Sequence, residues 1–264
     1  MLEKIKKALK KTAFGEFIYA QEATLKWQLQ RAGSSLHPSA PQLGWVNETL
    51  QSKMQVQSAV DEVKKCGLTP HPDAPKNWDA LSTLKDILEL TPRTGTVLEV
   101  GAPLYSVMLQ WLYLYGYRGL HGIDLVYDKP VQRGPIRYEY GDLTQTHFGN
   151  ESFDAVVSLS VIEHNVDLKA YFKEMARLLK PKGRLYTSTD YWSTPVETHA
   201  QEAYGGPIKI FTREDMEAMI RLAAPYGLTP TEPPSWDCDE KAVCWERFQL
   251  NYTFTCFALE KSGD

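Results

Sequence analysis

The sequence predicts an α/β fold, with a mostly parallel sheet covered by helices on both faces. From about residue 77, short apolar segments of strand type alternate with segments of helical spacing. Acidic residues and glycines also meet at the ends of three predicted strands, in Glu99-Val100-Gly101, Gly122-Ile123-Asp124 and Gly141-Asp142-Leu143. Ligands bind open α/β sheets outside the carboxyl ends of the strands, so this series predicts a nucleoside-binding site.

Each predicted element follows from its own pattern. The first helix of the alternating region has Trp78, Leu81, Leu84 and Leu88 on one face. Phe153-Asp154-Ala155-Val156-Val157-Ser158 is almost continuously apolar, as in a strand buried on both faces. We expect strands at residues 96–102, 119–125, 136–143, 153–160, 183–190 and 251–261. We expect helices at residues 106–115, at 168–179 with a stop at Pro181-Lys182-Gly183, and at 212–226 with Thr212 and Asp215 as a capping box.

Two units are predicted along the chain, a helical extension over residues 1–75 and an α/β domain over residues 76–264. Helical spacing recurs before residue 30 and again over residues 47–65, and three prolines at 70, 72 and 75 then form a short stiff linker. We expect the extension to cover the site as a lid. The alternative is that five lysines around Leu2, Ile5 and Leu9 bring the N-terminus to an anionic membrane surface as a peripheral contact.

The composition and charge of the chain argue against several classes of protein. The 264 residues carry a net charge of −4, which argues against a nucleic-acid partner. We find no apolar run long enough to cross a bilayer and no secretory signal. Four cysteines without a Cys-x-x-Cys pair favour free thiols and a cytoplasmic location. Nothing in the sequence indicates an oligomeric state.

The alternating region resembles the class I S-adenosylmethionine-dependent methyltransferases. The resemblance rests on the order of the strand-end motifs above, on Ser160-Val161-Ile162-Glu163-His164, and on Leu178-Leu179-Lys180-Pro181-Lys182-Gly183. It implies a Rossmann-like seven-stranded sheet whose last strand is antiparallel.

The same resemblance implies which residues bind the cofactor S-adenosylmethionine. Gly101 would lie against its methionine part, Asp124 would bind both ribose hydroxyls, and Ser160 would lie beside the sulfonium. Asp142 and Leu143 would frame the adenine. The complete implied set is Glu99, Gly101, Ala102, Asp124, Leu125, Asp142, Leu143 and Ser160.

The sequence departs from the family at the loop after the first strand. The family's Gly-x-Gly-x-Gly is replaced by Gly101-Ala102-Pro103-Leu104-Tyr105. Proline removes an N–H donor and tyrosine adds bulk where glycine permits close approach. We expect the loop to take another path, with Tyr105 turned away from the pocket or at its edge. The alternative is a degenerate methyltransferase fold that serves as a binding or regulatory module.

The implied activity is transfer of a methyl group to a small-molecule acceptor, by O-methylation, as an enzyme of the EC 2.1.1 class. A nicotinamide-dependent oxidoreductase is disfavoured because Gly101 is not followed by Gly-x-x-Gly. Acceptor chemistry at oxygen benefits from a general base. His164 is the first candidate, with Glu163 and Tyr191 as further catalytic candidates; alternatively, His164 satisfies only a local backbone bond.

A metal site is not expected. Some related O-methyltransferases carry Glu-x-x-Glu-His at this point, whereas here Ser160 replaces the first carboxylate. Glu163 and His164 alone are an incomplete ligand set, which Asp190 or His199 would have to complete.

Overall fold

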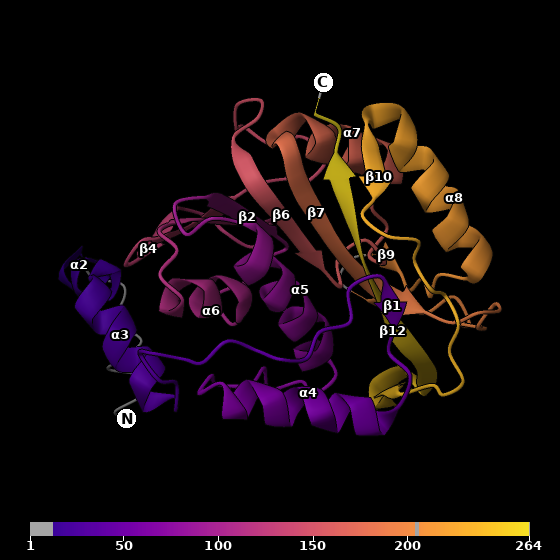
Figure 1. The fold of residues 1–264 in the computed structure, drawn as a ribbon, viewed down its shortest axis with the longest axis horizontal. Helices are drawn as coiled ribbons and strands as arrows, with labels where there is room; N and C mark the ends of the chain where they lie inside the picture. The colour runs from indigo at the N-terminus through magenta and orange to yellow at the C-terminus, as the bar shows by residue number, and fades with distance from the viewer. Residues whose placement is uncertain (1–12, 204–205, 264) are drawn as a thin grey trace.

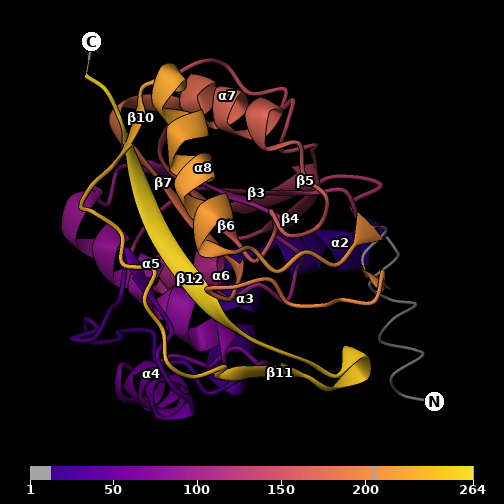
Figure 2. The same ribbon diagram turned by 90° about the vertical axis from the view of Figure 1, so that its right-hand side faces the viewer.

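The predicted α/β fold is confirmed by a computed structural model, which describes residues 13–203 and 206–263. A twisted sheet lies at the centre, with helices on both faces (Figures 1 and 2). One face carries α5 (Lys76–Leu90) and α6 (Met108–Leu114), and the other carries α7 (Leu168–Leu178) and α8 (Arg213–Ala223). The helices therefore shield both faces of the strands from water.

Seven strands form the body of the sheet, in the order β5-β3-β2-β6-β7-β12-β10. The first five are parallel to one another, and β12 is antiparallel to its neighbours β7 and β10. This agrees with the predicted seven strands and antiparallel last strand. Their bounds are β2 Thr96–Val100, β3 Gly119–Asp124, β5 Ile136–Tyr140, β6 Phe153–Leu159, β7 Leu179–Tyr191, β10 Leu228–Pro230 and β12 Leu250–Lys261.

Short strands complete the edges of this sheet. β1 (Glu48–Thr49) and β11 (Val243–Trp245) pair with β12, and β4 (Val131–Arg133) pairs with β5. A separate pair, β8 (Glu202–Ala203) with β9 (Gly206–Pro207), lies in the connection before α8. The single-turn helices are η1 (Ala224–Tyr226) and η2 (Glu246–Phe248).

Three element boundaries differ from the prediction. The helix expected over residues 47–65 is α4 (Lys53–Lys65), because Glu48 pairs with Cys256 as a strand residue. The helix expected from residue 106 begins at Met108, after a turn in which the Ser106 N–H bonds to the Pro103 carbonyl. The Pro181-Lys182-Gly183 stop is also wrong: α7 ends at Leu178, and β7 begins directly at Leu179.

The extension packs against the same core as the sheet. Leu25 and Leu29 from α3 (Glu22–Arg31) and Val63 from α4 belong to one buried cluster with residues of α5 and α6. The Glu22 carboxylate also accepts from Tyr113 at 2.9 Å and pairs with Arg118 at 2.8 Å. α2 (Ala13–Ala20) precedes α3, and the lysine-rich segment before it lies outside the described residues.

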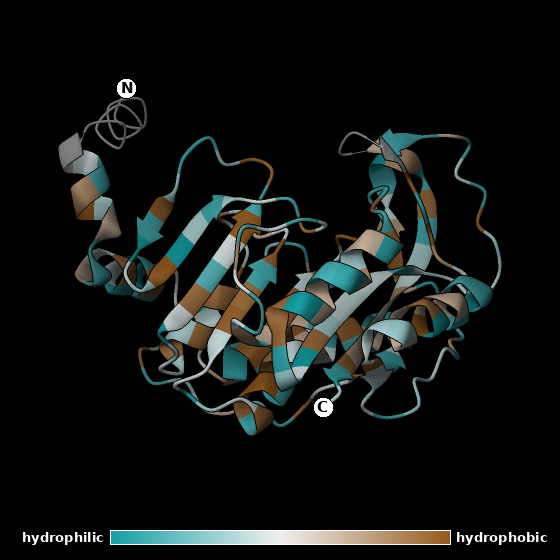
Figure 3. Cartoon of the chain, turned by 90° about the horizontal axis from the view of Figure 1, so that it is seen from above, coloured by the Kyte–Doolittle hydropathy of each residue, from teal (hydrophilic) through white to brown (hydrophobic). Residues whose placement is uncertain are grey.

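Hydropathy follows this layering. In Figure 3 both the strands and the helices carry brown segments between teal and white ones, and the brown segments supply the buried clusters between the layers. A second buried cluster on the α7–α8 face includes Phe172, Met175, Met216 and Phe257. In the described ranges, no helix combines the length and apolar content that a membrane span needs.

The turn after β2 depends on Gly101. Its φ of +68° lies in the left-handed region, which residues with a side chain rarely adopt. A Cβ at this position would also lie 2.5 Å from Cγ2 of Val161, in the turn after β6. At the carboxyl edge of the sheet, the backbone of the turn after β2 therefore packs against a side chain of the turn after β6.

We predict that Gly101→Ala lowers the free energy of unfolding by more than about 1 kcal/mol, because alanine is strained in the left-handed region and overlaps Val161. Urea denaturation measures this change. Adding Val161→Ala should recover the part due to overlap and leave the backbone strain. A Gly101→Ala protein as stable as the wild type would contradict the assignment.

We predict that Thr212→Ala costs about 1 kcal/mol of stability, because it removes the N-cap of α8. The predicted capping box is confirmed, with the Thr212 hydroxyl accepting from the Asp215 N–H and the Asp215 carboxylate accepting from the Thr212 N–H. Thr212→Ser keeps the hydroxyl and is the matched control in the same denaturation experiment. Equal losses for both variants would show that the methyl group, not the cap, matters.

Candidate active site

A cavity of about 1060 Å³ opens at the carboxyl edge of the parallel strands. Its walls come from the residues that follow β2, β3, β5 and β6, from the end of β7, from the start of α5, and from β11 and β12. Nine of the eleven predicted site residues line the cavity, and only Ala102 and Tyr191 do not. The nine are Glu99, Gly101, Asp124, Leu125, Asp142, Leu143, Ser160, Glu163 and His164.

One half of the cavity, here called the nucleoside half, carries Asp124, Leu125, Asp142 and Leu143. Asp124 ends β3, and its Oδ1 accepts from the Val126 N–H at 3.1 Å. This contact is a local turn, as the purely structural interpretation of a strand-end carboxylate expects, and it uses one of the two carboxylate oxygens. Leu125 is 64% exposed beside it and presents an apolar surface at the mouth.

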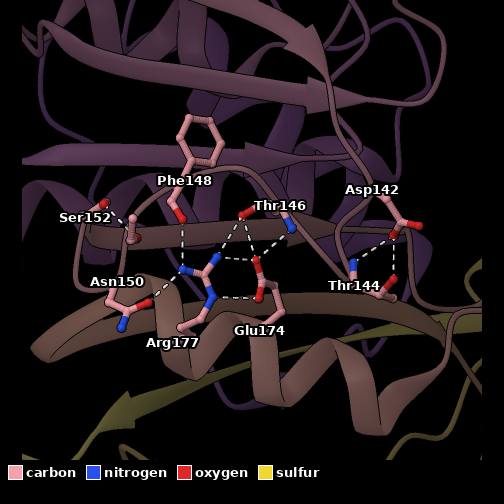
Figure 4. A network of polar contacts seen from close by, with 9 residues as sticks. Asp142, Thr144, Thr146, Phe148, Asn150, Ser152, Glu174 and Arg177 are labelled. Atoms are coloured by element: carbon pink, nitrogen blue, oxygen red, sulfur yellow. Dashed lines mark hydrogen bonds and ion pairs between the residues drawn. The ribbon is translucent and has the colours of Figure 1, made fainter.

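Asp142 also organises a turn. Its Oδ1 accepts from the Thr144 N–H at 2.8 Å and from the Thr144 hydroxyl at 2.6 Å. The loop that follows is tied to α7 by Arg177, which donates to the Phe148 carbonyl at 2.8 Å and pairs with Glu174 (Figure 4). Glu174 in turn accepts from the Thr146 N–H at 2.7 Å. The network holds the wall that carries Asp142 against the body of the domain.

Among the described residues, two that line the cavity, Glu99 and Ser160, have a buried polar atom without a hydrogen-bond partner. Glu99 is 4% exposed, and its Oε1 accepts a short hydrogen bond from the Ser106 hydroxyl. Among the described residues, Glu99 Oε2 and Ser160 Oγ are buried with no hydrogen-bond partner. Burial raises the pKa of Glu99 to about 7. Unpaired buried oxygens carry a free-energy cost that a polar ligand in the cavity would remove.

The loop that departs from the family pattern leaves this region open. Tyr105 lines the mouth, is 67% exposed and meets the His71 ring edge-on at 6.4 Å. Ala102 is fully buried and does not line the cavity; its N–H bonds to the Ile123 carbonyl at 3.0 Å. The loop therefore carries the tyrosine at the edge, and Ala102 packs into the fold.

The other half, here called the acceptor half, contains a buried charged cluster. Asp79, Glu163 and Asp190 are each at most 4% exposed, and all three line the cavity with Lys76. Burial opposes the charge on Lys76, yet the Asp79, Glu163 and Asp190 carboxyls together raise its pKa. Burial raises the pKa of each of these carboxyls, and Lys76 opposes that rise.

Hydrogen bonds orient the carboxyl groups of the cluster. The Thr189 hydroxyl donates to Glu163 Oε2 at 3.0 Å, and the Ser188 hydroxyl donates to Asp79 Oδ2 at 2.6 Å. Both donors come from β7, so the strand register sets the positions of the two carboxyls. The cluster is consequently a fixed feature of the sheet edge.

His164 lies next to this cluster with its Nε2 4.0 Å from Glu163 Oε1. Burial and the nearby Lys76 lower the pKa of His164 to about 4, so the imidazole is neutral at pH 7. Tyr191 does not reach the cavity: it is fully buried, and its hydroxyl donates to the Trp236 carbonyl at 2.6 Å. His199 is exposed and does not line the cavity either. Within the described ranges, no three metal-binding side chains are grouped as a metal site.

Several residues that line the cavity were not predicted from the sequence, namely His71, Lys76, Asp79, Tyr252 and Phe254. A signal existed for Asp79, which stands among apolar residues in Trp78-Asp79-Ala80-Leu81, three positions after Lys76. A carboxylate at a buried helix position needs a partner. The aromatic residues of β12 carried no such signal, because alternating apolar residues are ordinary in a strand.

Comparisons with known proteins agree with this architecture. Residues 99–187 match the family model of the methyltransferase domain. The chain is 32% identical over 95 residues to a sterol 24-C-methyltransferase of Clavispora lusitaniae, covering 33% of this chain and 25% of that protein. It is 34% identical over 59 residues to an O-methyltransferase of Pyrenophora dematioidea, covering 22% of each. The matched segments thus span about a quarter of these relatives.

A solved structure shows the same fold. Phosphoethanolamine N-methyltransferase 2 of Haemonchus contortus, in complex with S-adenosyl-L-methionine, superposes with a TM-score of 0.50 at 16% identity, covering 80% of this chain and 56% of that one. The family match begins at the end of β2 and runs to the middle of β7, through the strands that carry the cavity. Residues 99–187 of the chain therefore match a methyltransferase domain, and the observed strand order is the one that the resemblance to class I S-adenosylmethionine-dependent methyltransferases implies.

Proposed function

We propose that this protein transfers a methyl group from S-adenosylmethionine to a hydroxyl oxygen of a small-molecule acceptor. When bound, the cofactor supplies an electrophilic methyl group on a sulfonium. The observation that carries the proposal is the cavity itself, in which a nucleoside half and an acceptor half meet at Glu99 and Ser160. Methyl transfer requires the two reactants to be held in line in a site with little water.

The residues of this chain fit the cofactor. Asp124 offers carboxylate oxygens for the ribose hydroxyls, and Leu125 and Leu143 offer apolar surface for the adenine. Glu99 Oε2 and Ser160 Oγ supply hydrogen-bonding atoms where the two halves meet, beside the place proposed for the sulfonium. The contact between Gly101 and Val161 supports this placement, because a side chain at residue 101 would disturb the floor of the cavity.

Glu163 is the better candidate for the general base. A base works best when its pKa is near the operating pH, and burial raises the pKa of Glu163 toward neutrality. The pKa of His164, about 4, makes its imidazole a weak base. We therefore assign proton removal from the acceptor hydroxyl to Glu163. Neutral His164 accepts a hydrogen bond from the acceptor and orients it.

We propose that the extension covers the acceptor half through its last residues. His71, Asp73 and Pro75 line the cavity, whereas α2, α3 and α4 contribute no lining residue in the described part of the chain. The four cysteines are free, which supports a reducing, cytoplasmic location as part of the same proposal. Association with anionic vesicles would instead favour the peripheral membrane role of the N-terminus.

The competing function is a binding module that has lost catalysis. It draws support from Pro103 and Tyr105 in the family's glycine-rich loop. The position of Tyr105 at the mouth, where 67% of it is exposed, favours the enzyme, because the ring leaves the centre of the cavity open. Cofactor binding without transfer to any acceptor is the outcome expected of the module.

We predict that Asp124→Ala weakens S-adenosylmethionine binding by about 1.5–3 kcal/mol, the value of a hydrogen bond to a charged group. Isothermal titration calorimetry measures the change. Asp128→Ala is the matched control, because Asp128 is an exposed carboxylate four residues later that does not line the cavity. Unchanged affinity in a folded Asp124→Ala protein would refute the ribose assignment.

We predict that Glu163→Gln lowers methyl transfer by about 10²–10⁴-fold, the usual contribution of a general base. Transfer of labelled methyl from S-adenosylmethionine to a panel of hydroxylated small molecules measures it. Wild-type activity should fall as the pH drops below neutrality, because protonated Glu163 cannot accept a proton. His164→Gln should cost less; the reverse order of the two losses would make His164 the base.

A further inference from the structure

We propose that three buried carboxyl groups make this cavity select S-adenosylmethionine, whose sulfur is positively charged, over its product S-adenosylhomocysteine, whose sulfur is neutral. The groups belong to Glu99, Glu163 and Asp190, here called the acidic row. The inference rests on the proposed function and extends it to release of the product. Its consequence is that the spent cofactor leaves the site in favour of a fresh one.

The acidic row follows the sheet. Glu99 lies in β2, Glu163 follows β6 and Asp190 lies in β7, and these three strands are neighbours. Each residue is at most 4% exposed, and each lines the cavity. Glu99 Oε2, with no hydrogen-bond partner in the described part of the chain, is an independent sign that this surface awaits a positively charged or hydrogen-donating ligand.

When the carboxyls of the acidic row are ionised, the balance of charge along this surface is negative. Lys76 is the single lysine or arginine among the described residues that line the cavity. Asp79 lies on the same helix as Lys76, and its carboxyl also interacts with the positive charge of Lys76. His71 and His164 do not add positive charge at neutral pH, because burial lowers the pKa of both. Among the described residues of the lining, the positive charge of Lys76 therefore faces four carboxyls, the three of the acidic row and that of Asp79.

A bound sulfonium adds a positive charge that offsets the excess negative charge of this surface, whereas a neutral thioether adds no charge. In the proposed function the reacting sulfur lies between the nucleoside half and the acceptor half, beside the acidic row. An opposite charge within about 4–6 Å shifts a carboxyl pKa by about 1–3 units, and by linkage it binds the ionised carboxyl about tenfold or more tightly than the protonated one. The two cofactor forms differ only in the transferred methyl group and in the charge on sulfur. Because the methyl contacts do not depend on pH, the pH dependence of the affinity ratio isolates the charge on sulfur.

The preference should depend on pH. Burial raises the pKa of Glu99 to about 7, with Asp124 on β3 adding to the rise and the Ser106 hydroxyl opposing it. Burial also raises the pKa of Glu163 and Asp190; Lys76 of α5 opposes this rise for both, and Asp79 of α5 adds to it for Glu163. Tyr252 of β12 bonds to Asp190, and Asp73 and neutral His164 complete the surroundings. The pKa values of Glu99 and Glu163 are both about 7, so these two carboxyls are ionised above that pH and protonated below it. Selection is therefore present above about pH 7 and lost below it.

Calorimetric titration of the full chain with S-adenosylmethionine and with S-adenosylhomocysteine tests the proposal. We expect S-adenosylmethionine to bind about tenfold or more tightly near pH 8, and this ratio to shrink about tenfold near pH 6. Glu163→Gln should reduce the ratio near pH 8 and leave the affinity for S-adenosylhomocysteine unchanged. Glu214→Gln is the matched control, since Glu214 is exposed on α8 away from the cavity.

The pH series on the wild-type protein keeps the test independent of whether the variant folds. Equal affinities for the two compounds across the pH range, or tighter binding of S-adenosylhomocysteine, would overturn the proposal. A folded Glu163→Gln protein with an unchanged ratio would overturn the assignment of Glu163 to the row. Absence of binding by both compounds would instead refute the proposed function.

Discussion

The attraction between Lys76 and three buried carboxyl groups is the interaction on which the acceptor half depends. Lys76 opens α5, Asp79 follows one turn later, and Glu163 and Asp190 come from the ends of β6 and β7. The positive charge of Lys76 and the negative charges of the carboxyls each lower the cost of burying the other. The cluster therefore fixes where α5 meets the sheet, and with it the wall that the end of the extension contributes to the cavity.

The two halves of the cavity use carboxylates in different ways. Asp124 and Asp142 lie near solvent at strand ends, and each also holds a local turn through one oxygen. Such residues can bind neutral hydroxyl groups without a large desolvation cost. Glu163 and Asp190 are buried, so their state depends on neighbouring charge. The proposed methyl transfer removes a positive charge from sulfur, and the buried carboxyls of Glu163 and Asp190 respond to such a change in neighbouring charge.

Local pattern was sufficient for most of the fold and failed where pairing partners decide. The strands after residue 95 and the cap at Thr212 follow from periodicity and capping chemistry. Glu48 became a strand residue because β12 offers its backbone at Cys256 and Thr255. Leu179 left the helix early because it pairs with Phe153 in the neighbouring strand. Neither partner is near in sequence, so no local window could indicate it.

The sequence by itself determined the alternation of strands and helices, the acidic residues at the strand ends and the glycine at residue 101, because each is a property of one element and its turn. The tertiary structure alone decided which of them share a cavity. It excluded Tyr191, whose side chain packs under Trp236, and brought in Lys76 and Tyr252 from distant elements. The physical reason is that a period specifies the buried face of an element, whereas a site is composed by the elements that become neighbours in space.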